Sequence, residues 1–139
     1  MKQNLIRQFN AFSDEFCVKM CKFFADTSII KELDNQLYSN EDMLWFIFED
    51  DVVKGFLSIE DKIDYYYIDN FYVVKQYRNA DIGNCLLDKV LQTFKDKPIK
   101  LITRNDIALN MYLKRNFKVY RTKGRYFYLI KKEGEFYEN

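Results

Sequence analysis

The sequence predicts an α/β (α+β) fold with a mixed, mostly antiparallel central sheet of about six to seven strands and helices on both faces. Three segments rich in aromatic and β-branched residues follow one another between residues 43 and 74. Only short polar turns separate them, which predicts an antiparallel meander. A strand, an amphipathic helix and a further strand then continue to residue 103, which predicts a βαβ unit with parallel strands.

The first forty residues predict one strand and two helices. Residues 4–9 can form a short strand. Ser13 stands before Asp14 and Glu15 and is the expected N-cap of a helix over residues 14–25. Thr27 or Ser28 is expected to cap the second helix. Apolar residues at helical spacing carry the first helix (Phe16, Cys17, Met20, Cys21, Phe24) and the second (Ile29, Ile30, Leu33, Leu37).

The middle of the chain predicts the three strands of the meander. Residues 43–49 and 52–60 form a hairpin around the polar turn 49–51. Asp61 and Lys62 make a second turn, after which residues 63–74 form a long strand rich in Tyr, Phe and Val.

The last third alternates helices and strands. An apolar face of period 3.6 predicts a helix from Ile82 to Phe94, and Pro98 precedes a short buried strand at 99–103. Asn105 is expected to cap another helix, and Asn116 to end it in the left-handed conformation. Residues 117–122 and 126–131 then predict a hairpin.

Composition and charge restrict the class of protein. The 139 residues fit one domain, 1–139, and a hydrophobic content of 48% excludes a disordered chain. Lys and Arg number 22 against 21 Asp and Glu, so no net field attracts a polyanion, and nucleic acid is not an expected partner.

The residue types that are scarce exclude several chemistries. The sequence contains no His, which excludes Ser–His–Asp and Cys–His catalysis and His-ligated metals. Three Cys make no disulfide framework and fit a reducing compartment, and no metal site is expected. The N-terminus lacks a signal-peptide pattern, and the longest apolar runs are too short for a bilayer. A cytoplasmic protein without a membrane partner is therefore expected.

The segment between the long strand and the next helix predicts an anion site. A strand-to-helix turn presents several backbone N–H groups at a helix N-terminus, which suits a phosphate or pyrophosphate. Arg78 can add positive charge, and Gly83 allows close approach of the ligand. The alternative is that Asp81 only caps the helix and that Gly83 is incidental.

Two blocks of the sequence resemble the GNAT N-acetyltransferases. Residues 77–83 (Tyr-Arg-Asn-Ala-Asp-Ile-Gly) resemble the family's Arg/Gln-x-x-Gly-x-Gly/Ala pyrophosphate loop, and Val73 matches its strand valine. Residues 105–117 resemble the signature Asn-x-x-Ala-x-x-x-Tyr-x-x-x-Gly-Phe. The expected element order matches along nearly the whole chain. Two departures are Asp81, where the first Gly is usual, and Asn116, which replaces the Gly of the second block.

The resemblance implies acetyl-CoA as cosubstrate, bound where the fourth and fifth strands splay apart. The backbone of Phe71 and Val73 would pair with the pantetheine arm, and Asn105 would bond it. The pyrophosphate would lie on the loop residues Arg78, Asn79, Ala80, Asp81, Ile82, Gly83 and Asn84. Tyr112 matches the tyrosine that protonates the leaving thiolate.

The general base and the acceptor stay open. Asp69 is the candidate base, with Asp64 second, and either can be an ordinary strand residue. Residues 65–67, 71 and 72 are aromatic and can line an acceptor pocket or belong to the core. Three hypotheses follow: an N-acetyltransferase for a small-molecule or peptide amine, a non-catalytic or regulatory acyl-CoA-binding module, and an α/β interaction domain. A homodimer is also left open.

Overall fold

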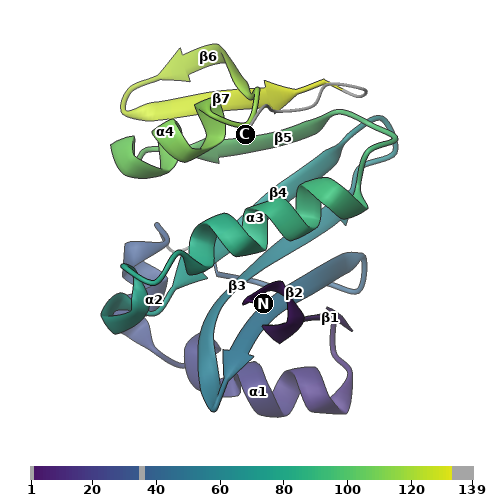
Figure 1. Ribbon diagram of the computed structural model, residues 1–139, viewed down its shortest axis with the longest axis vertical. Helices are drawn as coiled ribbons and strands as arrows, with labels where there is room; N and C mark the ends of the chain where they lie inside the picture. The colour runs from purple at the N-terminus through teal and green to yellow at the C-terminus, as the bar shows by residue number, and fades with distance from the viewer. Residues whose placement is uncertain (1, 35–36, 133–139) are drawn as a thin grey trace.

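The computed structural model describes residues 2–34 and 37–132. Within them the strands form a seven-stranded sheet in the order β1-β2-β3-β4-β5-β7-β6 (Figure 1). The neighbours β4 and β5 are parallel, and the other neighbouring pairs are antiparallel. The strands are β1 Ile6–Asn10, β2 Met43–Asp50, β3 Val52–Asp61, β4 Tyr66–Val73, β5 Ile99–Thr103, β6 Lys118–Lys123 and β7 Tyr126–Lys131. The predicted mixed, mostly antiparallel sheet and its element order are confirmed.

Helices cover both faces of the sheet. On one face, α1 (Asp14–Phe24) buries Phe16, Met20 and Phe23 in a cluster with Trp45 and Phe56, next to α2 (Thr27–Glu32). On the other face, α3 (Ile82–Thr93) buries Leu86, Leu87 and Val90 in a second cluster with Phe46 and Leu57. Adjacent residues of β2 and β3 therefore point into different clusters. This is why both strands are continuous apolar runs rather than alternating ones.

Within the described residues, the remaining helices are one α-helix and two short 3₁₀ helices. Helix α4 (Asp106–Leu113) packs against the α3-side cluster through Ala108, Leu109 and Met111. Two short 3₁₀ helices, η1 (Lys2–Leu5) and η2 (Lys75–Tyr77), precede β1 and the N-terminus of α3. Gly55 permits close packing of α3 on β3, because a Cβ there would lie 3.0 Å from Ile82 Cγ2 and 3.2 Å from the Tyr72 carbonyl oxygen.

Helix caps follow the sequence with one correction. The Phe16 N–H donates to Ser13 Oγ (3.3 Å) at the start of α1, as predicted. Helix α2, however, is capped by Asp26 rather than by Thr27 or Ser28. Its Oδ1 accepts the N–H groups of Ser28 (3.0 Å) and Ile29 (3.3 Å). The carboxylate one residue earlier reaches two free N–H groups, which a cap at Thr27 or Ser28 would not.

Several predicted boundaries move. The long strand begins at Tyr66 rather than at residue 63, because Lys62 N–H donates to the Tyr65 carbonyl (2.8 Å) and Ile63 has a left-handed φ of 78°. The first strand begins at Ile6 rather than residue 4, and α2 ends at Glu32, so Leu37 lies outside it. Cys17 and Cys21 lie on the exposed face of α1, not among its buried residues.

Strands β4 and β5 separate after a short paired region. They pair only at Tyr66–Ile99 and Tyr67–Lys100, whereas β4 continues to Val73 and β5 to Thr103. A bulge in β4 lies at the separation, where the register with β3 passes from Ser58–Asp69 to Phe56–Tyr72. Leu57 thus faces both Asn70, whose φ is 51°, and Phe71. The extra residue places Phe71 on the same side of the sheet as Ile68, in the α3-side cluster.

Candidate active site

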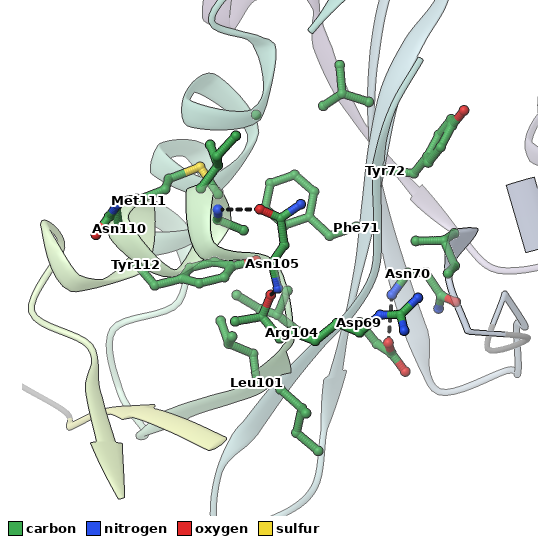
Figure 2. Close-up of a pocket in the computed structure, with 18 of the residues that line it drawn as sticks. Asp69, Asn70, Phe71, Tyr72, Leu101, Arg104, Asn105, Asn110, Met111 and Tyr112 are labelled. Atoms are coloured by element: carbon green, nitrogen blue, oxygen red, sulfur yellow. Dashed lines mark hydrogen bonds between the residues drawn. The ribbon is translucent and has the colours of Figure 1, made fainter. Parts of the chain in front are cut away.

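A cleft of about 1310 Å³ opens where β4 and β5 separate (Figure 2). Its walls come from β4, the N-terminus of α3, the β5–α4 connection, α4 and the β6–β7 turn. Most residues predicted for the site line it: Asp69, Phe71, Val73, Arg78, Asn79, Asp81, Gly83, Asn84, Asn105 and Tyr112. The fold therefore brings together side chains that lie up to 43 positions apart, between Asp69 and Tyr112.

The N-terminus of α3 presents free backbone donors to this cleft. Asp81 is its N-cap with a left-handed φ of 65°, and its side chain makes no capping hydrogen bond. The first intrahelical bond runs from Cys85 N–H to the Asp81 carbonyl (3.1 Å), so the N–H groups of Ile82, Gly83 and Asn84 come before it. The Asp81 carboxylate instead accepts from Asn84 Nδ2 (2.7 Å). The alternative in which the Asp81 side chain caps the helix is therefore wrong.

Gly83 leaves room on the cleft side of α3. A Cβ at this position would lie 3.7 Å from Val73 Cγ2, 3.8 Å from Met111 Sδ and 3.9 Å from Phe71 Cζ. These are ordinary van der Waals distances, so no backbone strain requires glycine here. The missing side chain instead keeps open the space between α3, β4 and α4.

The Arg78 guanidinium already has partners on β4 and on α2. Its Nε donates to the Val73 carbonyl (2.9 Å), its Nη2 pairs with Glu32 at the end of α2, and its guanidinium lies over the Tyr72 ring at 5.3 Å. No sequence pattern predicts Glu32 as a partner of Arg78, because Glu32 is 46 positions away. Arg78 is thus held at the cleft by a carboxylate rather than presented freely to it.

Two predicted loop residues do not line the cleft. Ala80 accepts a hydrogen bond from Lys2 Nζ on its carbonyl oxygen. Ile82 is buried in the α3-side cluster. The first turn of α3 directs Gly83 and Asn84 towards the cleft, and the Ile82 side chain points into the core.

Tyr112 and Asn105 face the cleft from α4 and the connection before it (Figure 2). The Asn105 Oδ1 accepts Ala108 N–H (3.0 Å) as the predicted cap of α4. The Tyr112 ring packs between Phe71 (6.5 Å) and Phe117 (5.6 Å). Burial, and then the negative charge of Asp69, raise the pKa of Tyr112 well above its usual range, so the phenol holds its proton at neutral pH.

Asp69 lies on β4 beside the bulge and lines the cleft. Burial raises the pKa of its carboxyl, partly offset by the hydrogen bond that its Oδ1 accepts from Asn70 N–H (2.8 Å) and by Tyr38. The second predicted base, Asp64, is exposed in the turn before β4 and lies outside the cleft lining. The aromatic residues Tyr67, Phe71 and Tyr72 line the cleft, and Tyr65 does not.

Contacts from the α2 side were not predicted. Asp34 pairs with Arg104 (2.6 Å), and both line the cleft. This ion pair therefore connects the segment after α2 with the β5–α4 connection across the cleft. In the described ranges 2–34 and 37–132, no cluster of Cys, Asp and Glu is suited to a metal ion. No helix in those ranges is both long and apolar enough to cross a membrane.

Comparisons with known proteins agree on one fold. A family model described as an acetyltransferase (GNAT) domain matches residues 10–127. No curated protein sequence matches the chain significantly. Escherichia coli ElaA superposes with a TM-score of 0.68 at 16% identity, covering 91% of this chain and 98% of that chain.

Two other similar structures were solved with ligands. The PaiA N-acetyltransferase of Thermoplasma acidophilum, in complex with coenzyme A, has a TM-score of 0.57 at 23% identity, covering 88% of this chain and 80% of that chain. Arabidopsis thaliana NAA60, in complex with a bisubstrate analogue, has a TM-score of 0.59 at 12% identity, covering 93% and 98%. At such identities these similarities show a shared fold.

Proposed function

The chain belongs to the GNAT acetyltransferase family, and on that premise we propose that residues 1–139 act as one acyl-CoA N-acyltransferase domain that transfers an acetyl group from acetyl-CoA directly to a primary amine. One observation carries the proposal. The cleft combines a helix N-terminus with free N–H groups and a strand edge without a partner, and both belong to the segments that resemble the family's motifs.

The residues present fit a CoA-type substrate. The N–H groups of Ile82, Gly83 and Asn84 can bind a pyrophosphate through hydrogen bonds and the helix dipole. The open space beside Gly83 admits the ligand backbone. Val74 N–H donates to β3 (Lys54 carbonyl, 2.8 Å), so Val73 directs its amide groups to the opposite edge, towards the cleft. Among the described strands, none pairs with this end of β4 on the cleft side, so it can bond the pantetheine amides as an added strand would, with the Val73 carbonyl shared with Arg78 Nε.

The chemistry needs one proton acceptor and one proton donor. Asp69 is the proposed acceptor for the amine proton, because its carboxyl lies in the cleft wall and burial raises its pKa, which makes it a stronger base than an exposed carboxylate. Tyr112 is the proposed donor to the leaving thiolate, because it lines the cleft and its phenol carries a proton at neutral pH. Attack by the free amine on the thioester carbonyl forms the C–N bond, and the C–S bond then breaks.

One observation supports a second candidate, a non-catalytic or regulatory acyl-CoA-binding module. Asp81 lines the cleft at the position where a pyrophosphate would lie, and its carboxylate repels an anion. A ligand then binds more weakly than it would at a neutral residue. The two candidates share the binding site and differ in turnover.

Calorimetry with acetyl-CoA followed by an amine panel separates the candidates. Binding at micromolar concentration with amine-dependent release of CoA supports the transferase. Binding without CoA release from any amine supports the module, and no binding at high micromolar concentration contradicts both. Free CoA is best measured by chromatography, because Cys17 and Cys21 are exposed and would react with thiol reagents.

A further inference from the structure

Glu60 lies beside Asp69 on the same face of the sheet. On β3, Glu60 is opposite Tyr67 of β4, and Ser58 is opposite Asp69. Residues two apart on a strand share a face, so Glu60 and Asp69 are diagonal neighbours across the ladder. Glu60 is only 8% exposed, although it is an acid.

One oxygen of Glu60 has no partner. Its Oε2 pairs with Lys62 Nζ at 3.2 Å, whereas its buried Oε1 makes no hydrogen bond within the described part of the chain. Ser58 cannot supply one, because its hydroxyl donates to the Asp69 carbonyl (3.1 Å). A buried carboxylate oxygen without a partner is costly, so a cation near this pair would be stabilised.

The groups around the two acids leave a net negative charge. Lys62 faces Glu60 from the turn after β3, Tyr67 and Asp69 face it from β4, and Tyr38 from the segment before β2. The β2 residue opposite Glu60 is the uncharged Met43. Two carboxylates thus face one ammonium group, beside a cleft whose wall includes Tyr67 and Asp69.

We propose that Glu60 and Asp69 form a carboxylate pair that receives the acceptor as its ammonium ion, with Asp69 taking the proton and Glu60 as the positioning residue behind it. This inference rests on the transferase function proposed above. It names the acceptor class as aliphatic primary amines, which are protonated at neutral pH, rather than arylamines or alcohols, which are not.

The ammonium ion gives one proton to Asp69, which releases it to water at the cleft, and the free amine attacks the thioester carbonyl. Tyr112 gives its phenolic proton to sulfur as the C–S bond breaks, and the nitrogen of the new amide returns a proton to Tyr112. The nitrogen loses two protons, one to solvent and one to the thiol.

Two substitutions test the carboxylate pair, because they should shift the pKa of Asp69 in opposite directions. Glu60→Gln removes a like charge and should lower the pKa of Asp69, whereas Lys62→Gln removes an opposite charge and should raise it. Carboxyl ¹³C NMR of Asp69 measures this directly, without turnover. Glu49→Gln, on the far half of β2, is the matched control and should leave the pKa of Asp69 unchanged.

The second readout is the pH dependence of kcat/KM with an aliphatic amine. The acidic limb should move to lower pH in Glu60→Gln and to higher pH in Lys62→Gln, because Asp69 must be deprotonated to act as base. Three results would overturn this inference while turnover persists. The pKa of Asp69 and the acidic limb of kcat/KM could shift in the same direction in both variants, or in neither. An arylamine could be preferred over aliphatic amines. Absence of turnover with every amine would overturn the transferase proposal, and this inference with it.

Discussion

The side-chain amide of Asn70 forms two hydrogen bonds with the backbone of Tyr38. Tyr38 N–H donates to Asn70 Oδ1 (3.1 Å), and Asn70 Nδ2 donates to the Tyr38 carbonyl (2.9 Å) and to Ser58 Oγ (2.8 Å). Asn70 is the bulge residue of β4 and is 3% exposed. The bulge therefore fixes the segment that brings Tyr38 to Asp69.

Removing this amide should destabilise the protein. Asn70→Ala deletes the bonds and leaves buried backbone groups unsatisfied, so we expect a loss of about 1–3 kcal/mol in the free energy of unfolding. Asn70→Gly deletes the same bonds but tolerates the positive φ, and should be about 1 kcal/mol less destabilising than Ala. Urea denaturation measures both. Equal losses would show that the left-handed backbone carries no strain.

Gly83 and Gly55 should respond oppositely to the same substitution. Gly83→Ala adds a methyl group at ordinary contact distances and should stabilise α3 by about 0.5–1 kcal/mol, yet it should weaken acetyl-CoA binding by filling the cleft. Gly55→Ala forces a Cβ to 3.0 Å from Ile82 and should cost about 1–3 kcal/mol. Thermal denaturation measures the stability of both variants, and calorimetry measures the acetyl-CoA affinity of Gly83→Ala. Unchanged affinity in Gly83→Ala would place the ligand elsewhere.

Freeing Arg78 should strengthen cofactor binding. Glu32→Gln removes the carboxylate that pairs with Arg78 and leaves the guanidinium at the cleft. We expect up to about a fivefold gain in acetyl-CoA affinity, the range of an exposed ion pair of about 0.2–1 kcal/mol. The gain should shrink at high salt. Glu41→Gln, an exposed acid before β2, is the control, and weaker binding in Glu32→Gln would show that Glu32 supports the site.

Neutralising Asp81 should also raise the affinity for acetyl-CoA. Asp81→Asn keeps a side chain that tolerates left-handed backbone and can still bond Asn84, while it removes the charge beside the expected pyrophosphate. Asp81→Gly should act in the same direction. Asp106→Asn, in the first turn of α4, removes a carboxylate outside the cleft lining and should change nothing. Calorimetry measures the acetyl-CoA affinity of the three variants. Affinities equal to that of the unchanged protein would show that the Asp81 carboxylate does not repel the ligand.

Much of the fold could be predicted because its signals are local. The continuous apolar runs of β2 and β3, the caps Ser13 and Asn105 and the amphipathic α3 are all consequences of nearby residues. Ile63 misled the prediction, since an apolar residue suggests a strand, whereas the Asp61 side chain accepts its N–H (2.8 Å) and closes a turn.

The site could be predicted only in the two motifs that resemble those of the family, and the parts that were missed depend on distant contacts. Glu32 and Asp34 reach Arg78 and Arg104 only after folding. The bulge at Asn70 has a weak local sign, two polar residues within an aromatic strand, but the role of Asn70 is set by Tyr38, 32 positions away. The orphaned oxygen of Glu60 is likewise a property of packing.

Acetyl-CoA is proposed to bind where β4 and β5 separate, and amide NMR of the ¹⁵N-labelled protein can locate its binding site residue by residue. Titration with acetyl-CoA should shift the N–H signals of Ile82, Gly83 and Asn84 and of the β4 residues Phe71 and Val73, and Gly83→Ala should weaken the response. Acetate alone should leave these signals in place. If acetyl-CoA shifts none of these signals, or shifts only those of amides away from this cleft, acetyl-CoA does not bind at the proposed site.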